Sequence, residues 1–252
     1  MRQFFSVAIL ACLLTVLPGR TGAAAEVALQ TSPAAIAIDS LYNGENLTVT
    51  GEIPADSQLV IRLSGQPTTF HMKEKGKVLG VLWMNTDKVT FENAPAVFLV
   101  AASKDVPEQL RDKLGVPGLG ESIATTAKDA EKATLVAEFL KFQKSEKLYR
   151  ENAGQVTLGP DAGDVRTFTA VLQLPSRLSP GHYMVQAFAV KDGAVAATGE
   201  LDVKASFVGI PAFMADMAFN HGTLYGILAS IIAILGGLVI SQIFRGSKSG
   251  AH

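Results

Sequence analysis

The sequence predicts a mainly β protein: an exported, immunoglobulin-like β-sandwich with a helical insertion, followed by one C-terminal transmembrane helix. Two observations predict this fold class. Short segments with period-two alternation, separated by Gly, Pro, Asn and Asp, fill residues 27–103 and 154–205. Residues 223–244 contain no charged side chain, and about 20 apolar helical residues cross the roughly 30 Å hydrocarbon layer of a bilayer.

The first 25 residues have the pattern of a secretory signal peptide. Arg2 supplies a positive start, Phe4 to Leu17 form an apolar stretch, and Ala23-Ala24-Ala25 precede an expected cleavage before Glu26. An uncleaved N-terminal anchor is the alternative. Cys12 is the only cysteine, so the mature chain is expected to have no disulfide and no thiolate chemistry.

Residues 27–103 are expected to form a run of short strands with closely spaced turns. The turns are predicted at Asn43-Gly44, at 54–57 and at Gly76-Lys77, because Gly, Asn and Pro adopt turn conformations readily. The strands between them are expected at 36–42, 47–53, 59–63, 70–75, 78–84, 89–91 and 97–101. Many short strands of this kind favour a sandwich or a barrel.

Residues 104–152 are expected to be helical. A short helix is predicted at 107–114, a Gly- and Pro-containing interruption at 115–120, and a long helix within 125–150. The apolar face expected for the long helix consists of Ala133, Val136, Ala137 and Leu140, widened by Phe139 and Leu148. This helix is expected to pack over the sheet, and a partner-binding helix is the alternative.

Residues 154–205 return to β structure, with strands at 166–174 and 183–190 and a last strand at 194–204. Lys191-Asp192-Gly193 is expected to join the last two as a hairpin. We therefore expect one exported domain over residues 26–205, with its helical insertion at 104–152. Two small β-domains bridged by helices are the alternative.

Residues 206–222 are predicted to form an amphipathic juxtamembrane stem. Pro211 is expected to begin or kink its helix. Such a stem can lie in the lipid headgroup layer or dock on a partner. Its expected contact residues are Phe207, Ile210, Phe213, Met214 and Met217.

The predicted transmembrane helix, 223–244, carries a small residue at every fourth position: Ala229, Ala233, Gly237 and Ser241. Small side chains let two membrane helices approach closely, so this face is a candidate contact with a second copy or with another membrane protein. An unpaired lipid anchor is the alternative. Basic residues in the short tail, 245–252, predict a cytoplasmic C-terminus and a periplasmic N-terminal domain in a bacterial inner membrane.

Several motifs, in order along the chain, bear a resemblance to a bacterial family. They are Gly80-Val81-Leu82-Trp83-Met84-Asn85, Phe91-Glu92-Asn93-Ala94-Pro95, Glu138-Phe139, Leu148-Tyr149, Leu174-Pro175, Pro180-Gly181-His182-Tyr183 and Leu224-Tyr225-Gly226. This arrangement resembles the alphaproteobacterial putative transmembrane protein family. The sequence departs from the family pattern in two places. It has an extra residue between Gly80 and Trp83, and a Gly- and Asp-rich segment before the β region of residues 154–205. The resemblance implies a type I inner-membrane protein without established activity, of a kind often encoded beside sulfite-exporter-type permeases.

The sequence offers no residues with the spacing of a catalytic or metal site. A Gly-x-Ser-x-Gly elbow and a His-Glu-x-x-His motif are both absent, and the net charge of −1 gives no indication of nucleic-acid binding. Asp161 and Asp164 are candidates for a cation-binding loop. Met214 and Met217, beside His221, are candidates for a Cu(I) site. Solvated loop residues and interfacial packing are the expected roles, so no enzyme activity, metal or cofactor is predicted.

Three functional hypotheses follow. The leading one is a membrane-anchored periplasmic accessory protein that assists a sulfite-exporter-type permease. The alternative is a ligand-binding or sensory module for a small anion, with Arg62, Trp83 and Tyr149 lining its pocket. A membrane-anchored hydrolase or copper protein is the third.

Overall fold

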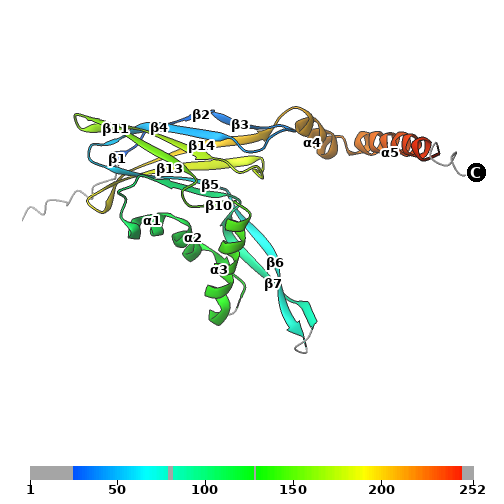
Figure 1. Ribbon diagram of the computed structural model, residues 1–252, viewed down its shortest axis with the longest axis horizontal. Coiled ribbons are helices and arrows are strands. Elements are labelled where there is room, and N and C mark those ends of the chain that lie inside the picture. Colours follow the sequence, from blue (N-terminus) through cyan, green and yellow to red (C-terminus); the bar gives the residue numbers. More distant parts are fainter. Residues whose placement is uncertain (1–24, 79–81, 128, 246–252) are drawn as a thin grey trace, which may run out of the picture.

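The computed structural model describes residues 25–78, 82–127 and 129–245 (Figure 1). Its main body is a β-sandwich from which two helices leave at one end. The predicted signal peptide and all of the predicted tail except Arg245 lie outside the described residues. The side chains of 74–87, including that of Trp83, are outside the description as well.

Two sheets form the sandwich. The first sheet has the order β1 (Ala25–Glu26), β14 (Ala194–Phe207), β13 (Gly181–Lys191), β5 (Gln58–Gly65), β8 (Phe98–Ala102) and β10 (Tyr149–Arg150), with β3 (Ala35–Ile38) also paired to β14. The second sheet has the order β11 (Gly154–Ala162), β12 (Val165–Gln173), β4 (Asn46–Pro54) and β2 (Leu29–Ser32).

The sandwich core lies between these sheets. Alternate residues of each strand enter it, such as Leu47 and Val49 of β4 and Val185 and Ala187 of β13, all fully buried. This period-two burial is what the alternating sequence of an antiparallel sheet produces. The prediction of a mainly β fold with one C-terminal apolar helix is confirmed. Its immunoglobulin-like part stays a prediction.

A second core covers the outer face of the first sheet. It is built by the hairpin of β6 (Pro67–Val78) and β7 (Leu82–Pro95), by β9 (Ala124–Thr125), and by the helices α1 (Glu108–Leu114), α2 (Val116–Ser122) and α3 (Asp129–Ser145) (Figure 1). Phe139 of α3 is central to it, since its ring stacks on Phe91 at 4.5 Å and meets Phe70 at 5.4 Å. The helical insertion therefore shields a sheet face that would otherwise be solvent-exposed.

The predictions at two of the expected turns were wrong: no turn forms at Gly76-Lys77, and no hairpin forms at Asn43-Gly44. Gly76 and Lys77 lie inside β6, paired with Met84 and Trp83 of β7, because one long hairpin replaces the three short strands that were expected. The predicted hairpin around Asn43-Gly44 does not form either. The chain does turn there, but β3 belongs to the first sheet and β4 to the second, so the loop passes between sheets.

The helical region also differs from its prediction. The expected interruption at 115–120 is helix α2, in which Pro117 occupies the first turn, where its missing N–H costs no hydrogen bond. The buried face of α3 consists of Val136, Phe139 and Gln143, whereas Ala133 and Ala137 are exposed. The predicted apolar face therefore included two exposed alanines, Ala133 and Ala137, and did not include the buried Gln143.

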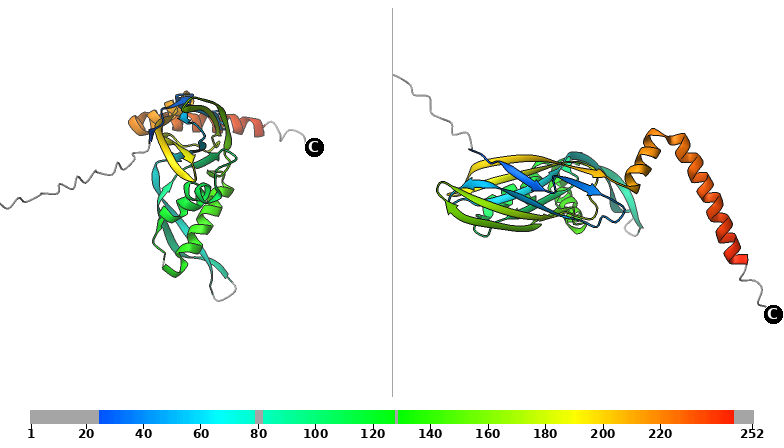
Figure 2. Two further views of the ribbon diagram at one scale, coloured as in Figure 1. Left: turned by 90° about the vertical axis from the view of Figure 1, so that its left-hand side faces the viewer. Right: turned by 90° about the horizontal axis from the view of Figure 1, so that it is seen from above.

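The C-terminal part of the chain leaves the sandwich directly from β14. Helix α4 (Ile210–Asn220) is followed after a single residue by helix α5 (Gly222–Arg245), and Figure 2 shows the elbow between them. Pro211 lies in the first turn of α4, so it begins this helix. Phe207, expected in the stem helix, is instead the last residue of β14, because its backbone pairs with Ile38 of β3.

Candidate functional site

The candidate site is the elbow between α4 and α5. Gly209, with a φ of +64°, redirects the chain from β14 into α4, a conformation that residues with a Cβ rarely adopt. His221 joins the two helices: its backbone N–H donates to the carbonyl of Met217 at 3.1 Å, and its carbonyl accepts from Tyr225 at 3.0 Å. Backbone hydrogen bonds therefore continue through the bend on both sides of His221.

A groove of about 450 Å³ lies inside this elbow, and we call it the elbow groove. Its lining residues come from both helices and none is charged: Ile210, Phe213, Met214 and Met217 of α4, and Tyr225, Leu228, Ala229, Ile232 and Ala233 of α5. The structure thus brings six of the nine predicted contact residues together. Tyr225, Leu228 and Ile232 were missed, since their part in the groove depends on the bend, which no local pattern predicts.

The remaining predicted residues lie elsewhere. Phe207 is at the end of β14, and Gly237 and Ser241 lie further along α5, beyond the groove. The four predicted small residues of α5 are therefore divided: Ala229 and Ala233 line the elbow groove, whereas Gly237 and Ser241 continue along the span.

Helix α5 is long and apolar enough to span a membrane over Gly222–Phe244. These 23 residues have a helical length of roughly 35 Å, slightly more than a typical hydrocarbon layer. The hydroxyl of Ser230 donates to the carbonyl of Gly226 at 2.8 Å, so this polar group is satisfied within the helix. The span therefore presents apolar and small groups to its surroundings.

The three glycines in the interior of this span, Gly226, Gly236 and Gly237, have open space around them. A Cβ added at any of the three would meet no atom within 4 Å. Glycine in a helix interior costs about 1 kcal/mol relative to alanine. The packing of the described chain does not explain why glycine is present at these positions despite this cost. Close approach by another helix would explain it.

The groups proposed for an anion pocket are engaged with the protein itself. Arg62 donates from Nε and Nη2 to Oε1 of Gln186, at 2.9 and 2.6 Å, and from Nη1 to the carbonyl of Leu114. Burial lowers the pKa of Arg62. Tyr149, only 1% exposed, donates to the carbonyl of Pro95 at 2.7 Å, and burial raises its pKa. Both groups therefore stabilise the second core.

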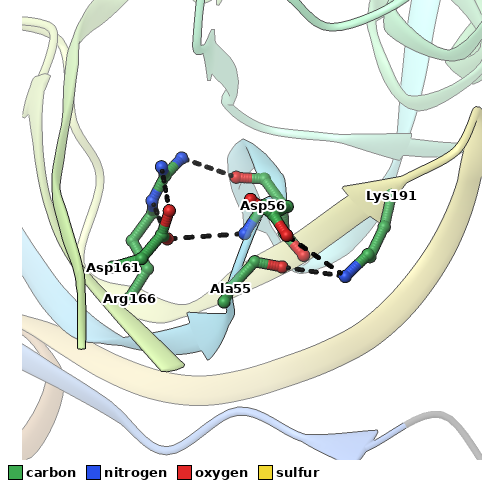
Figure 3. A network of polar contacts seen from close by, with 6 residues as sticks. Ala55, Asp56, Asp161, Arg166 and Lys191 are labelled. Atoms are coloured by element: carbon green, nitrogen blue, oxygen red, sulfur yellow. Dashed lines mark hydrogen bonds and ion pairs between the residues drawn. The ribbon is translucent and has the colours of Figure 1, made fainter. Parts of the chain in front are cut away.

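The loop with Asp161 and Asp164, for which no cation site was predicted, lies at the end of the sandwich far from α4 (Figure 1), and Asp161 belongs to an ion-pair network there (Figure 3). Asp161 is held by Arg166 through Nε–Oδ1 and Nη2–Oδ2 distances of 2.8 and 3.0 Å. Lys191 reaches Asp56 at 3.8 Å and the carbonyl of Ala55 at 3.2 Å. The network joins the loop between β4 and β5 to the β11–β12 and β13–β14 hairpins, and the Asp161 carboxylate already has a cationic partner in Arg166. Among the described residues, no three His, Cys, Asp or Glu side chains gather as a metal site requires.

A second groove, of about 430 Å³, lies between α3 and the β6–β7 hairpin. Its floor is apolar, with Phe91 and Phe139, and Phe142 stands at its side with 46% of its surface exposed. This exposed ring is consistent with the partner-binding alternative for the helix, which stays a prediction.

Comparison with protein families gives a match over most of the chain. A model of the family described as "Putative transmembrane protein (Alph_Pro_TM)" matches residues 26–246, which includes the β-domain, the elbow and the span. No curated protein matches the chain.

Proposed function

Since the chain belongs to this transmembrane protein family, as its sequence resemblance implied, we propose that it is a single-pass accessory protein of a multi-spanning permease. The β-domain lies in the periplasm in this proposal, and the C-terminus lies in the cytoplasm. The protein acts by binding and has no enzymatic activity of its own. The sulfite-exporter type of permease is supported by the family resemblance alone.

The open glycines of α5 are the observation that carries this proposal. Gly226 and Gly237 share a face with Ser230, Ala233 and Ser241, and this set is named the small-residue face. In a bilayer, lipid chains are as apolar as leucine, so helices associate through close van der Waals packing of small residues. Glycines without an internal packing role therefore support contact with a helix from outside the chain.

The absence of charge in the span favours an accessory role for this chain over transport by the chain itself. Ion and proton paths through membranes use Asp, Glu, His, Lys or Arg side chains, and none of these lies between Gly222 and Phe244. A multi-spanning partner would supply the path, and α5 would supply a helix that packs against its outside.

The experiment is co-purification from native membranes with the double variant Ala233→Leu and Gly237→Leu. Added bulk on the small-residue face should reduce recovery of the permease about tenfold, equivalent to about 1.4 kcal/mol. The matched control is Leu235→Phe with Val239→Phe, which adds bulk to the opposite face and should leave recovery unchanged.

Equal recovery with both double variants would contradict the proposal. Differently tagged copies of this chain, expressed together, distinguish the other use of the face. If those copies co-purify and only their association is lost in the Ala233→Leu, Gly237→Leu variant, the small-residue face is a homodimer contact.

A further inference from the structure

Exposed apolar side chains are concentrated at the end of the sandwich that carries α4. Large hydrophobic side chains that are exposed within described residues 25–209 are Leu41, Phe142, Val165, Met184, Phe207 and Val208. Three of these six, Leu41, Phe207 and Val208, lie beside the exit to α4. Single exposed apolar residues need no explanation, but a cluster at one end of a domain indicates an interaction surface.

The fold holds Leu41 in this position. Its backbone N–H donates to the Asp39 carboxylate at 2.9 Å, which fixes the turn after β3. Strand β3 pairs with the end of β14, Ile38 opposite Phe207, and the N–H of Val208 donates to the carbonyl of Ile38 at 3.0 Å. Leu41 is 88% exposed, so it contributes little to the core although its backbone is ordered by this turn.

Helix α4 continues the same apolar surface. Ile210, Phe213 and Met214 are 67%, 58% and 50% exposed. The only polar side chains of α4 are Asp216 and Asn220, which hydrogen-bond to each other at 2.7 Å along one edge of the helix. The surface made by Leu41, Phe207, Val208, Ile210, Phe213 and Met214 is named the membrane-proximal rim.

The position of α4 points to the partner of this rim. Only His221 separates the C-terminal end of α4 from the span, so α4 lies next to the level at which the hydrocarbon layer begins. An apolar helix at this depth gains free energy by burying its apolar face about 5–10 Å into the boundary between headgroups and acyl chains. The one polar edge, Asp216 and Asn220, can remain in contact with water.

We propose that the membrane-proximal rim lies in the interfacial layer of the bilayer that α5 crosses. The β-domain is then held to the membrane surface at two places, through α5 and through the rim, and does not pivot freely on one helix. This contact does not depend on the permease. It uses apolar burial, because α4 contains no Lys or Arg, and it should therefore tolerate high salt and a lack of anionic lipid.

The test uses tryptophan fluorescence of the full chain in proteoliposomes of a zwitterionic lipid. Trp83 is the only tryptophan, so a Trp83→Phe background allows one reporter at a time. Reporters at the rim are Leu41→Trp and Phe213→Trp. The matched control is Val165→Trp, which replaces another exposed apolar residue at the opposite end of the sandwich.

Both rim reporters should have blue-shifted emission and lose about half of it to lipids brominated near the carboxyl end of the acyl chain, as expected for shallow insertion. The Val165→Trp reporter should be quenched by aqueous iodide and unaffected by brominated lipid. Iodide quenching of both rim reporters would overturn the proposal. Protection of both from iodide and from brominated lipid would also overturn it, since a protein would then cover the rim.

Quenching by brominated lipid at Phe213→Trp alone would overturn the two-place attachment, because the β-domain would stand away from the membrane. Each variant is first checked for the cooperative unfolding of the parent. If a tryptophan variant fails this check, Leu41→Cys and Val165→Cys in a Cys12→Ser background replace it. A membrane-impermeant maleimide should label Leu41→Cys about tenfold more slowly than Val165→Cys, and equal rates would contradict the proposal.

Discussion

The β-domain and the C-terminal elbow use glycine in opposite ways. In the domain, a Cβ at Gly51 would lie 2.6 Å from the carbonyl oxygen of Ala28, and one at Gly199 would overlap the carbonyl of Val27. In α5, a Cβ at Gly226 or Gly237 would meet nothing within 4 Å. Gly51 and Gly199 are required by close approaches within the chain, whereas the glycines of α5 have no such partner among the described residues.

The aromatic residues differ in the same way. Phe139 is 2% exposed and lies among three other aromatic rings, while Phe213 in α4 is 58% exposed. The sequence of the domain is therefore explained by its own packing. The sequence of the elbow and span is explained by what surrounds the chain, which we propose to be lipid and a membrane partner.

The largest effect is expected from Phe139→Ala. Loss of this ring from the second core should lower the free energy of unfolding of the domain by about 3–5 kcal/mol. Denaturant unfolding of the full chain in detergent measures it. Phe142→Ala, one turn away and half exposed, and Phe213→Ala in the elbow should each change it by less than about 1 kcal/mol. Equal losses of unfolding free energy for Phe139→Ala and Phe213→Ala would contradict this difference between the domain and the elbow.

The next largest difference between the two regions is expected from replacing glycines by alanine. Gly199→Ala forces its Cβ against backbone and should cost about 2–3 kcal/mol. Gly237→Ala meets no atom and should leave the domain unchanged while favouring the helix by up to about 1 kcal/mol. Thermal unfolding of the two variants, followed by circular dichroism, measures both effects. A destabilised Gly237→Ala chain would show that α5 packs within its own chain after all.

A smaller effect is expected at the far end of the sandwich. Arg166→Met removes the partner of Asp161 from the network of Figure 3 and should cost about 1 kcal/mol, less at high salt. Lys144→Met is the control, because the Lys144–Glu151 pair is solvent-exposed and should contribute no more than a few tenths of a kcal/mol. Urea unfolding at low and high salt distinguishes the two pairs.

The smallest effect concerns pH. Burial, with a contribution from Glu45, raises the pKa of Tyr42 to about 12. An unfolded tyrosine ionises near pH 10, so stability is full below about pH 10 and falls as pH rises from there through about 12. Tyr42→Phe should make this fall shallower and cost little at neutral pH, since the buried hydroxyl has no hydrogen-bond partner among the described residues. Alkaline titrations of unfolding that coincide for both proteins would contradict this role.

Strands with clear alternation were predictable from sequence. The β13–β14 hairpin, for example, has Lys191-Asp192-Gly193 where the turn was expected. Strand partners were less predictable, because turn residues such as Asn43-Gly44 show that the chain bends without showing which sheet the next strand joins. The hairpin of β6 and β7 was divided in the prediction at Gly76, since glycine marks turns more often than the interior of a strand.

The candidate site was predictable as two separate segments. Composition identified the apolar stem and the small residues of α5, because both signals are local. Their meeting in the elbow groove depends on the bend at His221, and the rim depends on β3 bringing Leu41 beside the end of β14. Contacts between distant segments of this kind are set by tertiary packing and were not accessible from spacing alone.

The most direct test of the account is photo-crosslinking within native membranes. A photoreactive side chain is placed at Gly237, on the small-residue face, and at Leu235, on the opposite face. We expect a protein adduct with a multi-spanning partner from position 237 and only lipid adducts from position 235. Lipid adducts alone from both positions would contradict it, because the open glycines of α5 would then face nothing but the bilayer.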